Sequence, residues 1–366
     1  MRLTMERRAE GGKWALLLSP LLAVVLTLVS SVVIFWLLGQ DPLRALSVYF
    51  WQPVSDAYGL QEVAVKATPL VLIAVGLALC FRSNNWNIGA EGQFLIGAIC
   101  GGGVAVWAHG WGGAWVLPLM LVAGALGGMA YALIPAILKA RLRVNEILVS
   151  LMLVYVADLF MDYLVRGPWR DPMGFNMPQT VSFGPEATLP LLFTGGRMNI
   201  GSVIALAVVV AFALVMARTL KGFEIRLVGQ APRAARFAGF SDTRLTITVF
   251  AISGALAGLA GVIEASGTVR QLLPGFSPGY GFTAIIVAFL GRLNPVGCLI
   301  AGVFIAITFI GGENAQIILR LPRDMTLVFQ GMLLFYILAC DTLILYRLRV
   351  VRPVDPGATP APGVRS

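Results

Sequence analysis

Polar side chains that could handle a solute gather in one short segment of an otherwise apolar sequence. This segment holds three asparagines, a tryptophan, an acid and an amide, at Asn84, Asn85, Asn87, Trp86, Glu91 and Gln93. Asn145 and Glu146 open a later apolar stretch in a similar way. Amide and carboxylate groups at membrane depth are costly enough to indicate a function. We therefore predict that the residues of the first segment line or brace a path for a solute.

A simpler interpretation of the same segment is a loop followed by a helix cap. Asn87 could cap a helix whose first turn contains Glu91, because the positive N-terminal end of a helix favours a carboxylate. A cap and a transport role are compatible with each other. Direct contact with a solute and a purely local role therefore both stay open.

Two further acids, Asp158 and Asp162, are spaced to share one face of a predicted helix. Carboxylates inside a membrane could relay protons in an ion-coupled secondary transporter. Near the outer interface they would instead be solvated. The ion-coupled carrier is thus the alternative to the interpretation developed below.

The sequence lacks the signatures of an enzyme. It contains one histidine and no HExxH, GxSxG or GxxxxGK[ST] motif. The four cysteines form no CxxC pair, so neither a disulfide nor a metal site is predicted. We assign no catalytic, cofactor-binding or metal-binding residue, and any ATP must be hydrolysed by another subunit.

The composition is that of a membrane protein. Of the 366 residues, 58% are apolar and 12% charged, and the mean hydropathy is +0.84. A helix needs roughly 20 apolar residues to span a hydrocarbon core of about 30 Å. We expect an all-α polytopic membrane protein with helices near 14–38, 62–81, 88–107, 113–138, 144–165, 199–217, 245–265, 279–291, 295–312 and 325–346.

The eighth of these ten helices, 279–291, is the shortest. Pro274, Gly275, Pro278 and Gly279 precede it, so a broken or half-crossing helix is expected there.

Positive charges predict the orientation of the chain. Most of the 27 Lys and Arg residues fall on the side that carries both termini, which makes the N- and C-termini cytoplasmic. Because the positive charges lie in loops as topology determinants, the net charge of +9 does not indicate nucleic-acid binding.

The chain is then divided into three parts. Residues 1–13 form a cytoplasmic N-terminus and residues 14–346 a single transmembrane domain, while residues 347–366, rich in proline, form a disordered cytoplasmic tail. The proline-rich connection 166–198 is external. It is expected to be a solvated loop, with capping of a pore or contact with an external partner as the alternatives.

The longest cytoplasmic connection, residues 218–244, has a helical pattern of its own. Pro232 fits a helix start and Gly239 a helix end, which predicts a helix of about two turns. Such a helix, with small residues and basic flanks, fits a groove on a partner protein. A bulky residue at Ala235 would then block docking by overpacking. The alternative is a basic loop that only fixes topology.

The segment 222–239 resembles the coupling loop of permease subunits in the ABC-importer superfamily that serves ribose, branched-chain amino acids and nucleosides. The matching positions are Gly222, Arg226, Gly229, Pro232, Ala234, Ala235, Ala238 and Gly239. The chain departs from the pattern at Ala231, where asparagine is common, so the helix cap there is expected to be weaker.

Residues 87–93, the Asn145-Glu146 pair and residues 167–172 resemble the nucleoside and simple-sugar branch of this superfamily. The resemblance implies the permease subunit of an ATP-driven importer in the bacterial inner membrane, and it adds Asn145 and Glu146 to the predicted translocation path. It implies three protein partners besides the lipid bilayer: a second permease subunit, the same or a different chain; an ATPase that uses ATP and Mg; and an external substrate-binding protein.

The predicted topology can be tested with reporter fusions. A reporter fused after Leu220 should be cytoplasmic and one fused near Gln179 external, because the Lys and Arg bias holds residues 218–244 inside. Alkaline phosphatase and fluorescent-protein fusions report the two sides. The reversed pattern would exclude the ten-helix arrangement with the N-terminus inside.

Overall fold

The computed structural model describes residues 2–7, 13–193, 195–322 and 324–351. Its α-helices are α1 Lys13–Leu37, α2 Pro42–Leu46, α3 Ala57–Arg82, α4 Ala90–Trp107, α5 Val116–Leu142, α6 Glu146–Arg166, α7 Ile200–Arg218, α8 Leu220–Gln230, α9 Pro232–Phe237, α10 Asp242–Ile263, α11 Tyr280–Leu290, α12 Pro295–Ile318 and α13 Met325–Leu345. Shorter elements are η1 Ser47–Trp51, η2 Gln52–Val54, η3 Pro185–Ala187 and η4 Glu264–Val269, and the strands are β1 Arg2–Arg7 and β2 Tyr346–Val351.

The all-α polytopic class is confirmed. Every predicted transmembrane helix has a counterpart, in the order α1, α3, α4, α5, α6, α7, α10, α11, α12 and α13. Within the described residues, eight helices are long and apolar enough to cross a membrane. The two shorter apolar helices are α11 and the part of α13 over Met325–Cys340.

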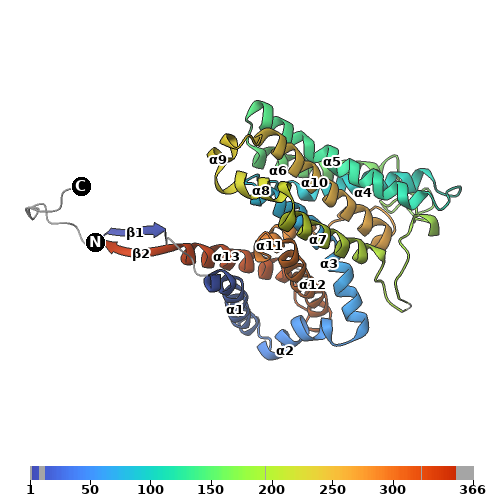
Figure 1. The fold of residues 1–366 in the computed structure, drawn as a ribbon. Coiled ribbons are helices and arrows are strands. Elements are labelled where there is room, and N and C mark those ends of the chain that lie inside the picture. The colour runs from blue at the N-terminus through green and yellow to red at the C-terminus, as the bar shows by residue number, and fades with distance from the viewer. Residues whose placement is uncertain (1, 8–12, 194, 323, 352–366) are drawn as a thin grey trace, which may run out of the picture.

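Helix α3 lies at the centre of the molecule, between α11 and α12 on one side and α7 and α10 on the other (Figure 1). In its most apolar part 89% of the residues are buried, against 22% in α1 and in α7. A helix that is apolar all round and buried belongs to a core, whereas the apolar outer faces of α1 and α7 suit lipid or another subunit.

Helices α4, α5 and α10 pack through glycines. A Cβ atom added to Gly97 of α4 would lie 2.2 Å from the Cα atom of Gly258 in α10. One added to Gly128 of α5 would lie 2.3 Å from the carbonyl oxygen of Gly254. Small residues at these positions let the helix backbones touch, which is how membrane helices associate without a strong hydrophobic driving force.

The connection between α3 and α4 turns back into the protein. A Cβ atom added to Gly76 of α3 would lie 2.9 Å from the Cα atom of Ser253. Beyond Gly76, α3 continues to Arg82, and residues 83–89 then return so that Asn87 bonds Ser253 as well. Helix α4 therefore starts inside the helix bundle, after a non-helical segment that protein surrounds.

Helix α11 crosses only part of the bundle, as predicted for the eighth helix. It has 11 residues, so its length is roughly 16 Å, about half of the hydrocarbon core. The non-helical residues 270–279 lead from η4 to its start, and Gly279, with φ +92°, permits the last turn of the backbone. Helix α11 is thus a half helix that begins inside the molecule.

The connection predicted to be external, residues 166–198, is attached along the residues that lead to α11. The N–H of Thr180 donates to the carbonyl of Leu272 at 3.0 Å, and the N–H of Phe183 to that of Arg270 at 2.8 Å. Thr180 and Phe183 are buried. This connection is therefore packed against the bundle over part of its length, and a purely solvated loop does not describe it.

An ion pair fixes the far end of the same connection. Arg197 forms hydrogen bonds with both carboxylate oxygens of Glu62 near the start of α3, and Glu62 is buried. Hydrogen bonding to this carboxylate raises the pKa of the Arg197 guanidinium above its already high usual value, so the guanidinium stays charged.

The two ends of the chain lie side by side. Strands β1 and β2 pair antiparallel, with Arg2 opposite Val351, and extend beyond α13 (Figure 1). Residues 347–351, predicted to belong to a disordered tail, thus lie in a strand because β1 supplies the backbone partners of β2. The rest of that prediction, 352–366, lies outside the described residues. The cytoplasmic position of both ends stays a prediction.

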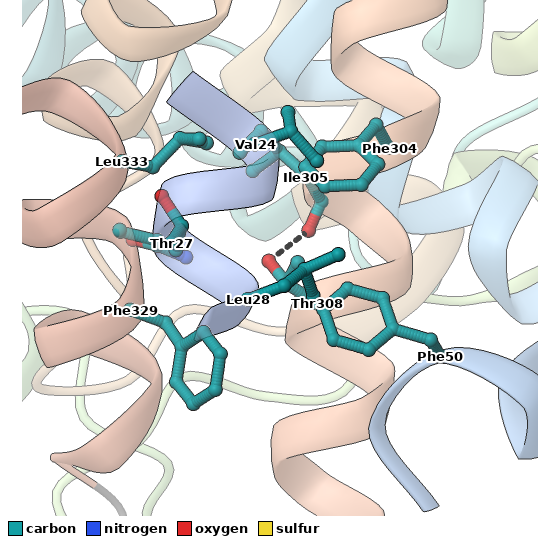
Figure 2. Close-up of a pocket in the computed structure, with 10 residues that line it drawn as sticks. Val24, Thr27, Leu28, Phe50, Phe304, Ile305, Thr308, Phe329 and Leu333 are labelled. Carbon is teal, nitrogen blue, oxygen red and sulfur yellow. Dashed lines mark hydrogen bonds between the residues drawn. The ribbon is translucent and has the colours of Figure 1, made fainter. Parts of the chain in front are cut away.

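Helices α1, α12 and α13 meet at a narrow crevice (Figure 2). The hydroxyls there bond within their own helices, from Thr308 to the carbonyl of Ile305 at 2.7 Å and from Thr27 to that of Ala23 at 2.8 Å. The crevice measures about 10 Å³, room for one water at most. It is too small for a solute path.

The glycine contacts predict the effect of a single methyl group. Gly258→Ala should destabilise the protein, because the new Cβ would lie 2.2 Å from the carbonyl oxygen of Gly124. Overpacking of this kind costs about 1–3 kcal/mol. Gly331→Ala in α13 is the matched control, since nothing lies within 4 Å of its Cβ position. Thermal unfolding in detergent measures both, and equal transition temperatures would contradict the described packing.

Candidate functional site

Four elements join in a polar network at the α3–α4 turn. The ammonium of Lys139 in α5 donates to Asn85 Oδ1 at 2.8 Å and to Glu146 Oε1 at 2.5 Å. Thr246 of α10 donates its hydroxyl to the same Asn85 oxygen at 3.0 Å, and the N–H of Trp86 to Glu146 Oε1 at 3.4 Å. The structure thus brings together three of the predicted path residues through a lysine and a threonine.

A cavity of about 680 Å³ opens beside this network. It is lined by Lys139, Ala140, Arg143, Val144, Asn145, Glu146, Ile147, Asp242, Thr243 and Thr246. Asn145 also caps α6, because its side-chain oxygen accepts from the N–H of Ile147 at 2.9 Å. Under the predicted topology this is the cytoplasmic end of the molecule. Asn145 and Glu146 are therefore placed where a solute could leave.

Asn87 and Gln93 form a closed pair deeper in the bundle. Each side-chain amide donates to the oxygen of the other, at 3.0 and 2.9 Å, and Asn87 also donates to the hydroxyl of Ser253 at 3.1 Å. Asn87 is 0% exposed. These amides brace α4 against α10 and touch no open space in this conformation.

The helix-cap interpretation of Asn87 is wrong in its simple form. The residue at the cap of α4 is Gly89, which has no side chain to donate or accept. Asn87 instead accepts from the N–H of Gly89 at 3.1 Å, a local turn that sets the entry into α4. The remaining path residue of the turn, Asn84, has φ 58° and accepts from the indole N–H of Trp86 at 3.3 Å.

Glu91 joins the two interrupted helices. It lies in the first turn of α4, and its Oε2 accepts from the N–H of Gly281, in the first turn of α11, at 2.5 Å. A Cβ atom added to Gly281 would lie 2.3 Å from the Glu91 nitrogen. The positive N-terminal ends of α4 and α11 therefore share one buried carboxylate, which both helix dipoles stabilise.

A second buried acid lies on the other side of the start of α11. Tyr280 donates its hydroxyl to Glu264 Oε1 at 3.3 Å, and Thr268 donates to Oε2 at 3.2 Å. The ammonium of Lys66 lies 5.7 Å from the centre of the Tyr280 ring. Lys66, Lys139, Thr246 and Ser253 were not predicted as site residues. Lys66 lies within the predicted helix 62–81, so a charge inside a membrane helix was the available signal, whereas Lys139 begins a basic cluster that is typical of a topology determinant.

The two aspartates of the ion-coupled interpretation lie in the second half of α6. Asp158 is exposed, and Asp162 pairs with Arg166 one turn later at 2.7 Å. An exposed pair of this kind contributes little to stability. This arrangement favours solvated acids over a buried proton relay.

The connection predicted to be cytoplasmic, residues 218–244, contains two helices rather than one. The first of them, α8, begins after Thr219, whose side chain caps it. This helix was not predicted, although the apolar residues Ile225 and Val228, three positions apart, indicate a helix face. A Cβ atom at Gly222 would lie 2.5 Å from a carbonyl of α7, and one at Gly229 would lie 2.0 Å from that of Arg82. These two glycines thus serve close packing inside the chain.

The predicted helix after Pro232 is α9. Ala231 at its start gives no side-chain cap, as expected, and Gly239 ends the segment with φ +84°. Ala235 is 1% exposed and packs into the hydrophobic core, so a bulky residue there would disturb the chain itself before any partner. The exposed positions of the predicted coupling set are Pro232, Ala234, Ala238 and Gly239.

Residues 59–338 match the family of permease components of branched-chain amino acid transport systems. The chain belongs to this permease family. It is 36% identical to the glucose ABC transporter permease protein TsgB13 of Haloferax volcanii, over 96% of this chain and 94% of that one. It is 31% identical to the guanosine ABC transporter permease protein NupP of Bacillus subtilis, over 88% and 92%.

A third relative is the nucleoside ABC transporter permease protein NupB of Lactococcus lactis, 28% identical over 87% of this chain and 90% of that one. The chain is therefore a permease subunit of an ABC transporter, a transport component rather than an enzyme, and a separate ATPase subunit uses the ATP. It is a multi-pass protein of the cell membrane, which in bacteria is the inner membrane.

The contact between the two buried helix starts predicts a graded series of effects on transport. Glu91→Leu should abolish most transport while the protein still inserts, because it leaves the buried N–H of Gly281 without an acceptor. An unsatisfied buried donor costs about 1–3 kcal/mol of folding free energy. Glu91→Gln keeps a carbonyl acceptor and should retain more transport. Asn87→Leu, which strands Gln93 and Ser253, should also impair it.

Uptake is measured per amount of inserted chain, with gel filtration to confirm assembly. If both leucine variants transported normally, the polar turn would have no part in transport.

Proposed function

We propose that this chain is the permease subunit of an ATP-driven importer for neutral solutes that carry several hydroxyl groups, such as sugars and nucleosides. The similarity to glucose, guanosine and nucleoside permeases supports this class, because each of those solutes presents adjacent hydroxyls on a ring. The buried amides and carboxylates of the path residues are groups that exchange hydrogen bonds with hydroxyls.

The observation that carries the ATP-driven mechanism is the surface of α9. Phe237 is 95% exposed at the end of this helix, in a connection that the charge distribution predicts to be cytoplasmic. Arg233 and Arg236 lie beside it at an open hollow. An exposed aromatic ring with arginine neighbours is the composition of an interface hot spot.

The occupant that fits this surface is the ATPase subunit. Helix α9 packs on α8, and α8 packs on α7 and on the end of α3. A partner that moves α9 would therefore act on the central helix through backbone contacts at Gly222 and Gly229. The coupling role proposed for this connection then belongs to two groups: exposed residues that touch the ATPase, and glycines that transmit its motion.

Two further partners complete the proposed assembly. A second permease subunit would cover exposed apolar helix faces such as that of α6, where Leu148, Met152, Tyr155 and Leu159 are exposed. An external substrate-binding protein would meet the outer connection, whose tip exposes Met173, Phe175 and Met177. This chain itself binds no cofactor in the proposed mechanism, and ATP with Mg belongs to the ATPase.

A substitution at Phe237 tests the docking surface. Phe237→Ser should lower the amount of ATPase that co-purifies and lower ATP-driven uptake of glucose or guanosine about tenfold or more, because a hot-spot side chain contributes about 2 kcal/mol or more. Insertion should be unaffected, since the side chain is exposed. Pull-down and uptake by proteoliposomes containing the complete transporter measure both effects.

Phe175→Ser is the matched control, an equally exposed phenylalanine on the opposite connection, and it should keep the ATPase bound. Uptake by the unaltered transporter should need ATP and resist a protonophore. Normal ATPase binding by Phe237→Ser would refute the docking surface, and collapse of uptake with the proton gradient would favour the ion-coupled carrier.

A further inference from the structure

A polar cavity lies above the start of α11, on the side away from the α3–α4 turn. It measures about 370 Å³ and is lined by Lys66, Ser277, Pro278, Phe309, Glu313, Gln316, Asp324, Thr326 and Leu327. These residues come from the first half of α3, the last part of α12, the start of α13 and the segment that descends to α11. Under the predicted topology, those parts are all at the external end.

The cavity exists because α11 is a half helix. Residues 270–279 occupy only part of the space that a full-length helix would fill, and Ser277 and Pro278 of this segment form part of the cavity wall. Non-helical backbone at membrane depth is tolerated where it lines a water-filled space. The cavity therefore reaches from the external end toward the middle of the bundle.

Charged groups inside two membrane helices line this space. Lys66 and Glu313 form an ion pair at 3.2 Å, with 17% and 52% of their side chains exposed. Asp324 adds a second acid at the start of the next helix. Ionisable groups within membrane spans are costly and face water-filled paths or one another. Among the described residues that line the cavity, two are acids and one is a base, which disfavours anionic solutes.

Aromatic rings close the inner end of the cavity. Phe309 lines it, and its ring centre lies 5.9 Å from that of the fully buried Tyr280. Tyr280 is the first residue of α11, and the next residue, Gly281, donates its N–H to Glu91. The rings offer an apolar face to a sugar or base ring, and they separate the cavity from the polar network at the α3–α4 turn in this conformation.

We infer that this cavity is the outward-facing solute site of the permease, and that Lys66, Glu313, Gln316 and Asp324 select neutral solutes with several hydroxyl groups. The inference rests on the proposed import function and adds the site. The carboxylates accept hydrogen bonds from hydroxyls, and the Gln316 amide both accepts and donates them. The volume is at the lower end of the range for small-molecule sites, which suits one monosaccharide or nucleoside.

Cysteine labelling tests whether the solute enters the cavity. In proteoliposomes of the complete transporter, Gln316→Cys should react with a membrane-impermeant maleimide from outside, and glucose or guanosine delivered by the binding protein should slow this reaction severalfold. Ile317→Cys is the matched control, because Ile317 is 80% exposed on the outer surface of the same helix and its labelling should not respond to solute. Equal labelling of Gln316→Cys with and without solute overturns the proposal.

Uptake measurements show whether Glu313 binds the solute or serves only as the ion-pair partner of Lys66. Glu313→Gln should lower uptake at saturating solute roughly tenfold, as expected for the loss of a charged hydrogen-bonding group. ATP hydrolysis stimulated by the binding protein should persist, because α9 is far from the cavity in the fold. The double variant Lys66→Met, Glu313→Leu removes both charges and leaves neither unpaired. It should stay as slow as the single variant, and restored uptake would mean that the pair is merely structural.

Uptake by the unaltered transporter tests the proposed function separately from the proposed solute site. If it imports neither sugars nor nucleosides with ATP, the proposed function fails. If it imports them while the cavity variants import them equally well, only the assignment of the site fails.

Discussion

The hydrogen bond from the Gly281 N–H to the Glu91 carboxylate is the contact on which the interior of this protein depends. Inside a membrane, each backbone N–H without a helical partner must be satisfied by the protein itself. Two helices, α4 and α11, begin within the bundle. Glu91 lies in the first turn of α4, and its carboxylate accepts a hydrogen bond from one of the free N–H groups at the start of α11. Without this shared acid, two helix ends would face each other with like partial charge.

The position of this contact divides the molecule into two polar regions. On one side, Lys139 holds the α3–α4 turn to α5 and α6, next to an open cavity. On the other, Lys66 and Glu313 line the cavity above α11. Between them lie closed side-chain pairs and packed rings. A transporter needs such a barrier between two openings, and here it consists of short helix ends, which can shift more easily than helices that cross the whole bundle.

Local patterns predicted the helices well but not the contacts among them. The ten predicted membrane helices, the half-length α11 among them, and the short helix α9 follow from apolar stretches, prolines and glycines, signals that lie within each segment. Helix α8 was missed because its amphipathic face is short. The buried side of α9 could not be foreseen, since Ala235 is one of several alanines and only tertiary packing decides which of them is covered. The outer cavity was also missed, because it joins Lys66 to Glu313 across most of the sequence.

The connection between α6 and α7, residues 166–198, shows how packing limits insertions and length changes in a loop. Proline-rich surface loops usually tolerate changes in length. Here the backbone bonds from Thr180 to Leu272 and from Phe183 to Arg270 fix two positions relative to the segment that carries α11. Inserted residues beside those bonds would displace the start of α11, whereas the exposed tip around Phe175 has no such attachment among the hydrogen bonds described. The fold therefore accommodates length variation and epitope insertion best within residues 173–177, where an insertion would alter the surface proposed to meet the binding protein but leave α11 in place.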